Sequence, residues 1–447
     1  MPLSSHHGIS LLPEITCPNC WGQFPPEEIL AIAGSPELTG DPKLSNPSER
    51  RRFPPTRFTP EGQPVDPRGS RCQEFACPKC HLLVPGVLLE RKPGLFVSAF
   101  GRPQSGKSYC LAASSHMLQA KTARRLGLAV TEPHTASNAL LRTYRRAIFN
   151  IADPDALVQL PKTDLAGDLW YHKVRYSEDD SDIRQYPRPM FYQVSPVAAV
   201  SNGGQQTQTI CLYDNAGEHF EPGHDRPDHP ETQHLARSSA LIFIFDPTQE
   251  PEFLRECLQQ STDPQFRYYG RKSEGAETQD VVLATADQSV KRHMGRELSV
   301  PLDIPLVVVL AKFDAWKHKI QGDLPEFLWR GDGQNDEAER FRSDVVRGVS
   351  QQMRKLLTKF CPAIVTAAER MSRRVCYVPT SATGCAPVVG GTGPGGLPLF
   401  KHRAGSIRPQ WAEVPMLWIL SQLVPDLIPL YQPTVTPPQL SQRAFSP

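Results

Sequence analysis

The segment Leu95–Cys110 (LFVSAFGRPQSGKSYC) constrains the fold of this 447-residue chain more than any other. A run of apolar residues leads into Gly101–Ser108, which matches the pattern G-x-x-x-x-G-K-S/T at every fixed position. In this pattern a strand leads into a glycine-rich turn and then a helix, and the turn binds phosphate groups. We therefore predict a strand, a phosphate-binding loop, and a helix that runs from Tyr109 to about Arg125.

Each residue type in this loop suits the phosphates of a nucleoside triphosphate. Gly101 and Gly106 allow the backbone to bend so that consecutive N–H groups point at phosphate oxygens. Lys107 would reach the β- and γ-phosphates, and Ser108 would offer its hydroxyl to Mg²⁺. The start of the following helix adds a positive dipole at the same place. The predicted nucleotide contacts of the loop are Gly101, Arg102, Pro103, Gln104, Ser105, Gly106, Lys107 and Ser108.

Two later segments favour guanine over adenine and supply further phosphate contacts. Thr209–Glu218 reads as a strand ending in D-x-x-G, in which Asp214 would hold Mg²⁺ through water and Gly217 would contact the γ-phosphate. Leu306–Asp314 reads as an apolar strand ending in K-x-D. The Asp314 carboxylate has two acceptor oxygens for the N1–H and N2–H donors of guanine, and adenine offers no such pair.

Two more contacts to the base are predicted. Lys312 would lay its methylene stem across the purine ring. A strand that begins at Cys376 leads to Ser381-Ala382, where a backbone N–H would meet the guanine O6. Each of these short patterns also occurs in ordinary strand-to-turn connections. Four of them at successive strand ends, in this order, favour a guanine-nucleotide site.

With these four elements, the segment from Leu95 to Tyr431 resembles the TRAFAC class of GTPases, which includes Ras-like and translation-factor G domains. The N-terminal cysteines and the long inserts are most similar to bacterial double-GTPase-type (DO-GTPase) proteins, a family associated with GTPase-centred conflict or defence loci. The resemblance implies a P-loop NTPase fold, which is a three-layer α/β/α sandwich around a mainly parallel sheet. Strands that alternate with helices through this region favour the same architecture.

Two residues depart from the pattern of this class. Ala311 begins the K-x-D element where many G domains have Asn or Thr, which removes the side chain for one loop-bracing hydrogen bond. Glu218 follows Gly217 where Ras-like enzymes carry a water-orienting Gln, and its charge would repel the γ-phosphate. We predict Lys107 and Glu218 as catalytic residues, with His219 assisting Glu218. We expect hydrolysis that is slow or that is stimulated by a protein partner.

The resemblance implies a switch-region threonine that binds Mg²⁺ between these elements. Thr163 lies shortly before Trp170–Tyr176, whose alternating pattern predicts a strand. We predict Thr163 as a magnesium ligand together with Ser108 and Asp214. The competing residues, which like Thr163 could be ordinary cap or loop threonines, are Thr131, Thr135 and Thr143.

A second strong pattern lies near the N-terminus. The turns Cys17-Pro-Asn-Cys20 and Cys77-Pro-Lys-Cys80 predict one tetrahedral Zn²⁺ site formed by the four cysteines. The long segment between them is interpreted as an insertion in one zinc ribbon, with a short helix from Pro25 to about Ala33. Four thiolates leave no open position for catalysis, so the role would be structural or partner-binding.

Alternatives to a zinc site remain open at this point. Paired disulfides seldom persist in the reducing cytosol, where GTP is found, but a redox pair or free buried thiols are also compatible with the spacing. Cys72 and His81 lie close enough in the sequence to replace one of the four ligands.

Composition limits the remaining function classes. A formal net charge of +2 does not indicate a nucleic-acid-binding protein, and we interpret Arg50–Arg52 as a solvated linker face. The sequence shows no charged-then-apolar signal peptide and no apolar stretch of about 20 residues, so we expect a cytoplasmic protein without a membrane span. We predict a zinc-ribbon module with a Pro- and Arg-rich insertion at 1–92, a G domain with inserts at 93–432, and a disordered Pro-rich tail at 433–447.

The leading functional prediction is a GTP- and GDP-binding regulatory switch that uses Mg²⁺. Contacts of the γ-phosphate with Thr163 and Gly217 would order a surface that a protein effector reads. Two alternatives remain: a nucleotide-bound scaffold that docks through its zinc ribbon without useful turnover, and an ATP-dependent P-loop protein.

Overall fold

The computed structural model describes residues 12–89, 92–134, 137–161, 170–177, 181–197, 207–214, 233–258, 260–261, 263–269, 278–320, 322–330, 338–393 and 398–432. Several predictions fall outside these ranges: those for Thr135, Thr163, Gly217, Glu218, His219 and the tail 433–447.

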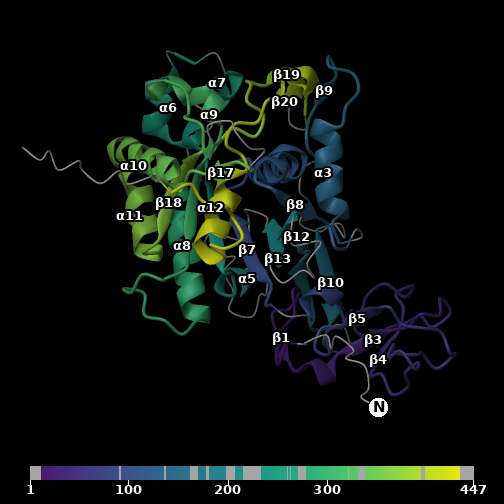
Figure 1. Cartoon of the computed structure of the whole chain (residues 1–447). Helices are drawn as coiled ribbons and strands as arrows, with labels where there is room; N and C mark the ends of the chain where they lie inside the picture. Colours follow the sequence, from purple (N-terminus) through teal and green to yellow (C-terminus); the bar gives the residue numbers. More distant parts are fainter. Residues whose placement is uncertain are drawn as a thin grey trace, which may run out of the picture.

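A seven-stranded, mostly parallel sheet lies at the centre of the molecule (Figure 1). The strands from β18 to β13 are parallel to one another, whereas β12 is antiparallel to both of its neighbours. Their order across the sheet is β18 (Val375–Pro379), β15 (Leu306–Leu310), β14 (Ala240–Phe245), β7 (Leu95–Phe100), β13 (Gln208–Asp214), β12 (Met190–Pro196) and β8 (Leu128–Thr131).

The central strands are continuous apolar runs because both of their faces are covered. Every residue of β14 (ALIFIF) and of β15 (LVVVL) is buried. Such runs are typical of parallel strands with helices on both sides of the sheet. The strands predicted at the four nucleotide-site patterns are confirmed as β7, β13, β15 and β18.

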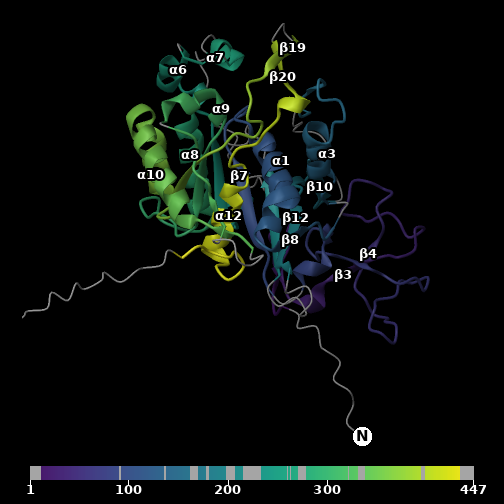
Figure 2. The ribbon, with the colours of Figure 1, turned by 45° about the horizontal axis from the view of Figure 1, so that its top comes forward.

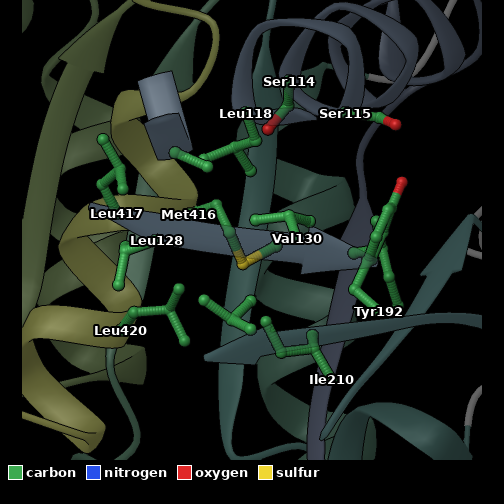
Figure 3. Close-up of a pocket in the computed structure, with 13 residues that line it drawn as sticks. Ser114, Ser115, Leu118, Leu128, Val130, Tyr192, Ile210, Met416, Leu417 and Leu420 are labelled. Atoms are coloured by element: carbon green, nitrogen blue, oxygen red, sulfur yellow. The ribbon is translucent and has the colours of Figure 1, made fainter. Parts of the chain in front are cut away.

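One face of the sheet is covered by α1 (Lys107–Met117), α3 (Ala139–Phe149) and α12 (Val414–Leu423). The chain continues from α1 through a π-helical turn (Leu118–Thr122) into α2 (Ala123–Arg125), which confirms the predicted helix to Arg125. Between α1, α12 and strands β8, β12 and β13 lies an apolar cavity of about 20 Å³ (Figure 3). It has room for about one water molecule.

The opposite face is covered by α5 (Gln233–Ala236), α8 (Gln279–His293) and α11 (Pro362–Met371), while α10 (Ser343–Phe360) packs beside the edge strand β18. The fold is therefore mixed α/β and compatible with a three-layer sandwich. Near the carboxyl ends of the parallel strands, at the top of Figures 1 and 2, lie α6 (Pro251–Leu258), α7 (Pro264–Tyr269) and α9 (Phe313–Trp316). Within the described ranges, no helix combines the length and apolar composition that crossing a membrane requires.

Several small sheets surround this core. The N-terminal module contains one hairpin, β1 (Ile15–Thr16) with β2 (Gln23–Phe24), and a second sheet in the order β4 (Arg52–Phe53), β3 (Leu30–Ile32), β5 (Glu74–Ala76), β6 (Leu83–Val84). The other small sheets pair β10 (Tyr171–Arg175) with β11 (Ile183–Pro187), β16 (Leu328–Trp329) with β17 (Arg340–Phe341), and β20 (Pro398–Arg403) with β19 (Val388–Thr392) and β9 (Leu157–Val158).

The helix predicted from Pro25 to about Ala33 is wrong. Only Pro26–Glu28 forms a 3₁₀ turn, and the next residues form strand β3. All three residues of β3 are buried between β4 and β5, and this strand pairing overrides the local helical preference.

The N-terminal module is a further layer on the central sheet. Its apolar core is continuous with the sheet face that presents Phe96, Cys211 and Tyr213. This face is opposite to the one that lines the cavity through Ile210 and Leu212, since neighbouring residues of a strand point to opposite faces.

Candidate functional sites

The first cysteine turn is closed by short-range hydrogen bonds. The N–H of Cys17 donates to the Gly22 carbonyl at 3.0 Å, and the N–H of Trp21 donates to the Cys17 carbonyl at 3.1 Å. Trp21 adopts a left-handed conformation with φ of 55°. The Asn19 amide donates to the Cys17 sulfur at 3.3 Å, which favours the thiolate form.

The second turn repeats this geometry. The N–H of Cys77 donates to the Leu82 carbonyl at 3.0 Å, and the N–H of His81 donates to the Cys77 carbonyl at 2.9 Å. His81 is left-handed with φ of 59°, and the Lys79 amide donates to the Cys77 sulfur at 3.3 Å. Each C-P-x-C sequence therefore folds in the same way and presents two sulfurs.

The two turns face each other and bring their four sulfurs within 4.8 Å of one another. The Cys17 and Cys80 sulfurs are 3.7 Å apart, as are those of Cys20 and Cys77. A tetrahedral site with Zn–S bonds of 2.3 Å has sulfurs about 3.8 Å apart, so the geometry fits a metal such as zinc. A disulfide, with S–S of about 2.05 Å, does not fit these distances.

Burial and hydrogen bonds between the thiols shift the pKa values of the cluster in opposite directions. Burial raises the pKa of the Cys17 and Cys80 thiols, whereas hydrogen bonds from the neighbouring thiols lower that of Cys77. A metal ion bound by all four sulfurs would require them to be thiolates, and its positive charge would stabilise that form against burial.

The two proposed substitute ligands are not part of this cluster. The His81 Nδ1–H donates to the Asp41 carboxylate, with Nδ1 2.9 Å from Oδ2. Although burial opposes ionisation, this hydrogen bond lowers the pKa of the Asp41 carboxyl. Cys72 is buried elsewhere in the module. The interpretation of Arg50–Arg52 as a solvated face is wrong for Arg52, which is buried and donates to the His81 carbonyl.

At the carboxyl edge of the sheet, the glycine-rich turn between β7 and α1 depends on its glycines. Gly101 and Gly106 have φ of 151° and 94°. A Cβ atom at Gly101 would lie 2.5 Å from the Ile244 carbonyl oxygen, so a larger residue would displace β14. The Lys107 ammonium folds over the turn and donates to the carbonyls of Gly101 and Arg102, at 3.0 and 3.1 Å.

The end of β13 is bound to the start of α1. The Ser108 hydroxyl donates to Asp214 Oδ2 at 2.7 Å, and the Tyr144 hydroxyl of α3 donates to the same oxygen at 3.1 Å. Burial raises the pKa of Asp214, and the charge of Lys107 opposes that rise. The predicted pair of Ser108 and Asp214 is thus in direct contact. Tyr144 was not predicted, since its only sequence signal is an aromatic residue on an amphipathic helix.

The end of β14 contributes a residue that the sequence patterns missed. Asp246 accepts hydrogen bonds from Thr248 (backbone at 3.0 Å, hydroxyl at 2.6 Å) and from the Gln249 amide at 3.0 Å. It also forms an ion pair with Lys312 at 2.6 Å. Gln249 in turn accepts from Arg102 at 3.1 Å. This network links the K-x-D element to the glycine-rich turn. The methyl group of Ala311, which begins the K-x-D element, cannot form such a hydrogen bond.

The ends of β15 and β18 are also joined. The Ser381 hydroxyl donates to the Asp314 carboxylate and accepts from the Gly384 amide at 2.7 Å. Ala382 follows Ser381 in the same turn. Burial raises the pKa of Asp314, and the bond from Ser381 opposes that rise. Burial also raises the pKa of Asp263, before α7, to about 6.

These groups gather at one edge because β7, β13, β14, β15 and β18 are parallel. In α/β sheets, this carboxyl edge is where ligands usually bind. Comparison with known proteins gives no further guide, because no model of a known family matches the chain and no curated protein is significantly similar to it.

Proposed function

We propose that this protein binds GTP and GDP with Mg²⁺ at the carboxyl edge of the sheet and acts in the cytoplasm as a regulatory switch of the TRAFAC class. The observation that carries the proposal is the convergence of four sequence patterns on one edge, with Ser108 in contact with Asp214 and Asp314 in contact with Ser381. The resemblance to DO-GTPases suggests a bacterial conflict system as its setting.

In this proposal the glycine-rich turn and the start of α1 bind the phosphates. Lys107 would exchange its two carbonyl acceptors, Gly101 and Arg102, for phosphate oxygens. Ser108, Asp214 and Thr163 would hold Mg²⁺, which neutralises phosphate charge when bound. A cation held beside Asp214 would favour its ionised form, against the burial that raises its pKa.

The other end of the site would read the base. Asp314 would accept the N1–H and N2–H donors of guanine, with its orientation fixed by Ser381. The ion pair with Asp246 supports Lys312 in the position from which its stem would cover the purine. Glu218 in place of a water-orienting Gln predicts slow or partner-stimulated hydrolysis.

Displacement of fluorescent GDP from the zinc-loaded protein, with Mg²⁺ present, tests the proposal. GTP and GDP should displace the probe and ATP should not. Equal or better displacement by ATP would overturn the guanine assignment, and failure to bind the probe would overturn the site. Single-turnover phosphate release then separates a GTPase from a scaffold that retains its nucleotide.

Asp314→Asn gives a sharper test of base recognition. An amide offers one donor and one acceptor, so GTP affinity should fall and affinity for xanthosine triphosphate, which has a carbonyl at C2, should rise. Asp344→Asn, at the start of α10, is the matched control and should bind GTP like the unchanged protein. Unchanged selectivity in Asp314→Asn would contradict the role of Asp314.

We also propose that the metal of the cysteine cluster is zinc. The sulfur spacing and the all-thiolate ligand set support it. Metal analysis of the protein purified without added metal should find one zinc per chain. Iron in its place, with an absorbing thiolate-to-metal band, would contradict the assignment.

A further inference from the structure

The first cysteine turn packs directly against the central sheet. The hydroxyl of Tyr213, on β13, donates to the Pro18 carbonyl at 2.5 Å and accepts from the indole N–H of Trp21 at 3.3 Å. Pro18 lies inside the Cys17–Cys20 turn and Trp21 directly follows it. Tyr213 is fully buried and Trp21 is 4% exposed, so water does not substitute for either bond.

Tyr213 immediately precedes Asp214. Successive side chains of a strand point to opposite faces. Tyr213 therefore faces the cysteine module, while Asp214 faces α1 and α3 and accepts the hydrogen bonds of Ser108 and Tyr144. Because the two residues share one peptide unit, a backbone shift that follows the loss of the Tyr213 contacts would also shift Asp214 relative to Ser108.

A second contact joins the module to the neighbouring strand. The ring of His234, on α5, stacks on Tyr213 with centroids 5.3 Å apart, and Trp21 lies 5.9 Å from the same histidine. His234 Nδ1 is 2.7 Å from the hydroxyl of Ser98, on β7. The aromatic cluster thus touches both strands that lead to the candidate phosphate and magnesium residues.

The positions of Pro18 and Trp21 depend on the closed turn. Trp21 is left-handed, which costs free energy for a residue with a side chain, and its N–H is bonded to the Cys17 carbonyl. The amides of Asn19 and Cys20 donate to the Cys17 sulfur. A metal held by the sulfurs stabilises this turn, and its loss would release both partners of Tyr213.

From this contact path we infer that metal binding at the four-cysteine cluster and nucleotide binding at the carboxyl edge are thermodynamically coupled, with Tyr213 as the positioning residue that carries the coupling. The inference rests on the proposed nucleotide site. Coupling between two sites is reciprocal, so bound nucleotide must raise metal affinity by the factor by which metal raises nucleotide affinity.

The reciprocal direction gives a test that needs no metal-free protein. Zinc affinity is measured by equilibrium competition with a metallochromic chelator, using the full-length zinc-loaded protein with and without saturating GDP and excess Mg²⁺. Lys107→Ala, which should not bind GDP, corrects for zinc chelated by the nucleotide itself. We expect GDP to raise zinc affinity at least about fivefold, the lower end of common coupling factors.

Two matched variants locate the coupling. Tyr213→Phe removes the hydroxyl that binds Pro18 and Trp21, while the cysteine ligands and the nucleotide contacts stay in place. In this variant GDP should raise zinc affinity by less than about twofold. Tyr192→Phe removes a tyrosine hydroxyl from the neighbouring strand β12, where the side chain lies on the opposite side of the sheet, among the residues that line the cavity (Figure 3). In this control GDP should raise zinc affinity as much as in the unchanged protein.

The outcomes separate the inference from the function on which it rests. Equal zinc affinity with and without GDP, in a protein that binds GDP, would overturn the coupling. An increase in zinc affinity in Tyr213→Phe equal to that of the unchanged protein would overturn the role of Tyr213. Failure of the zinc-loaded protein to bind fluorescent GDP would instead overturn the proposed function.

Discussion

The cysteine cluster and the carboxyl edge of the sheet both bury groups that ionise, but they offset that burial in different ways. At the edge, the chain supplies the partners: Asp246 has Thr248, Gln249 and Lys312, and Asp214 has two hydroxyl donors. At the cluster, the sulfurs lie against other sulfurs and accept hydrogen bonds from backbone amides and from the Asn19 side-chain amide. No cation from the chain belongs to the cluster among the described contacts.

This difference separates a preorganised site from one that a ligand completes. The edge keeps its geometry through internal hydrogen bonds and an ion pair, so its ligand need not hold the fold together. With the proposed zinc bound, the cluster would instead take its cation from outside the chain, and binding of that cation would be part of the folding free energy. We therefore expect metal loss to cost much more stability than nucleotide loss.

The largest expected effect follows from removal of one metal ligand. Cys20→Ser and Cys77→Ser should each abolish stoichiometric zinc binding, because one tetrahedral site uses both turns and a neutral hydroxyl is a poor zinc ligand. Each should lose several kcal/mol of unfolding free energy, as part of the roughly 10–16 kcal/mol of structural zinc sites. Zinc content and urea denaturation measure both effects.

Cys72→Ser is the matched control in the same module. Cys72 is buried but is not one of the four grouped cysteines, so this variant should keep its zinc. A variant of Cys20 or Cys77 that still holds one zinc per chain would show that the two turns do not share a single site.

A smaller effect is expected at the edge. Asp246→Asn removes the charge that pairs with Lys312, and we expect a loss of about 2–3 kcal/mol, since Asp246 is fully buried and Lys312 only partly so. GTP affinity should fall as well, because Lys312 and the Arg102–Gln249 contact lose their common support. Chemical denaturation and nucleotide titration measure the two effects.

Asp344→Asn again provides the control, because its side chain is 38% exposed and pairs with Arg342 at the surface. This control should change stability by less than about 0.5 kcal/mol. A loss in Asp246→Asn that is no larger would mean that the edge is not held by this network.

Much of this organisation could be predicted from local sequence. The strands β14 and β15 read as apolar runs because both of their faces are buried, and each C-P-x-C turn encodes its own closed geometry. The contact of Ser108 with Asp214 follows from two patterns at the ends of neighbouring parallel strands.

The missed residues share a physical reason. Tyr144 and Tyr213 act through partners far away in the sequence, as does Asp246 in its ion pair with Lys312, and no local spacing marks these contacts. The wrong prediction of a helix from Pro25 to about Ala33 has the same origin, because the pairing of β3 with β4 and β5 is a long-range effect. The roles of Gly217 and Glu218 remain predictions from sequence alone, because segment 215–232 lies outside the described residues.

The smallest expected effect concerns Asp263, a buried carboxyl at the edge. Like the thiols of the cluster, it has too few favourable contacts to offset the cost of burying its charge. It is 3% exposed, and burial, with smaller contributions from Asp314 and Asp246, raises its pKa to about 6. The unfolded chain has the ordinary value of about 4. The folded state therefore binds the proton more tightly, so this group lowers stability as the pH rises from about 4 through 6.

Asp263→Asn should remove this penalty, because the amide oxygen can still accept from the Gln265 amide but carries no charge. At pH 7 we expect the unfolding free energy to rise by about 1–2 kcal/mol. The upper limit is about 3 kcal/mol, set by a pKa shift of about two units. The advantage over the unchanged protein should shrink as the pH is lowered from 7 to 5.5, measured by denaturation of both proteins at each pH. An advantage that stays constant with pH would show that Asp263 is ionised without cost, and that the edge compensates all of these carboxylates.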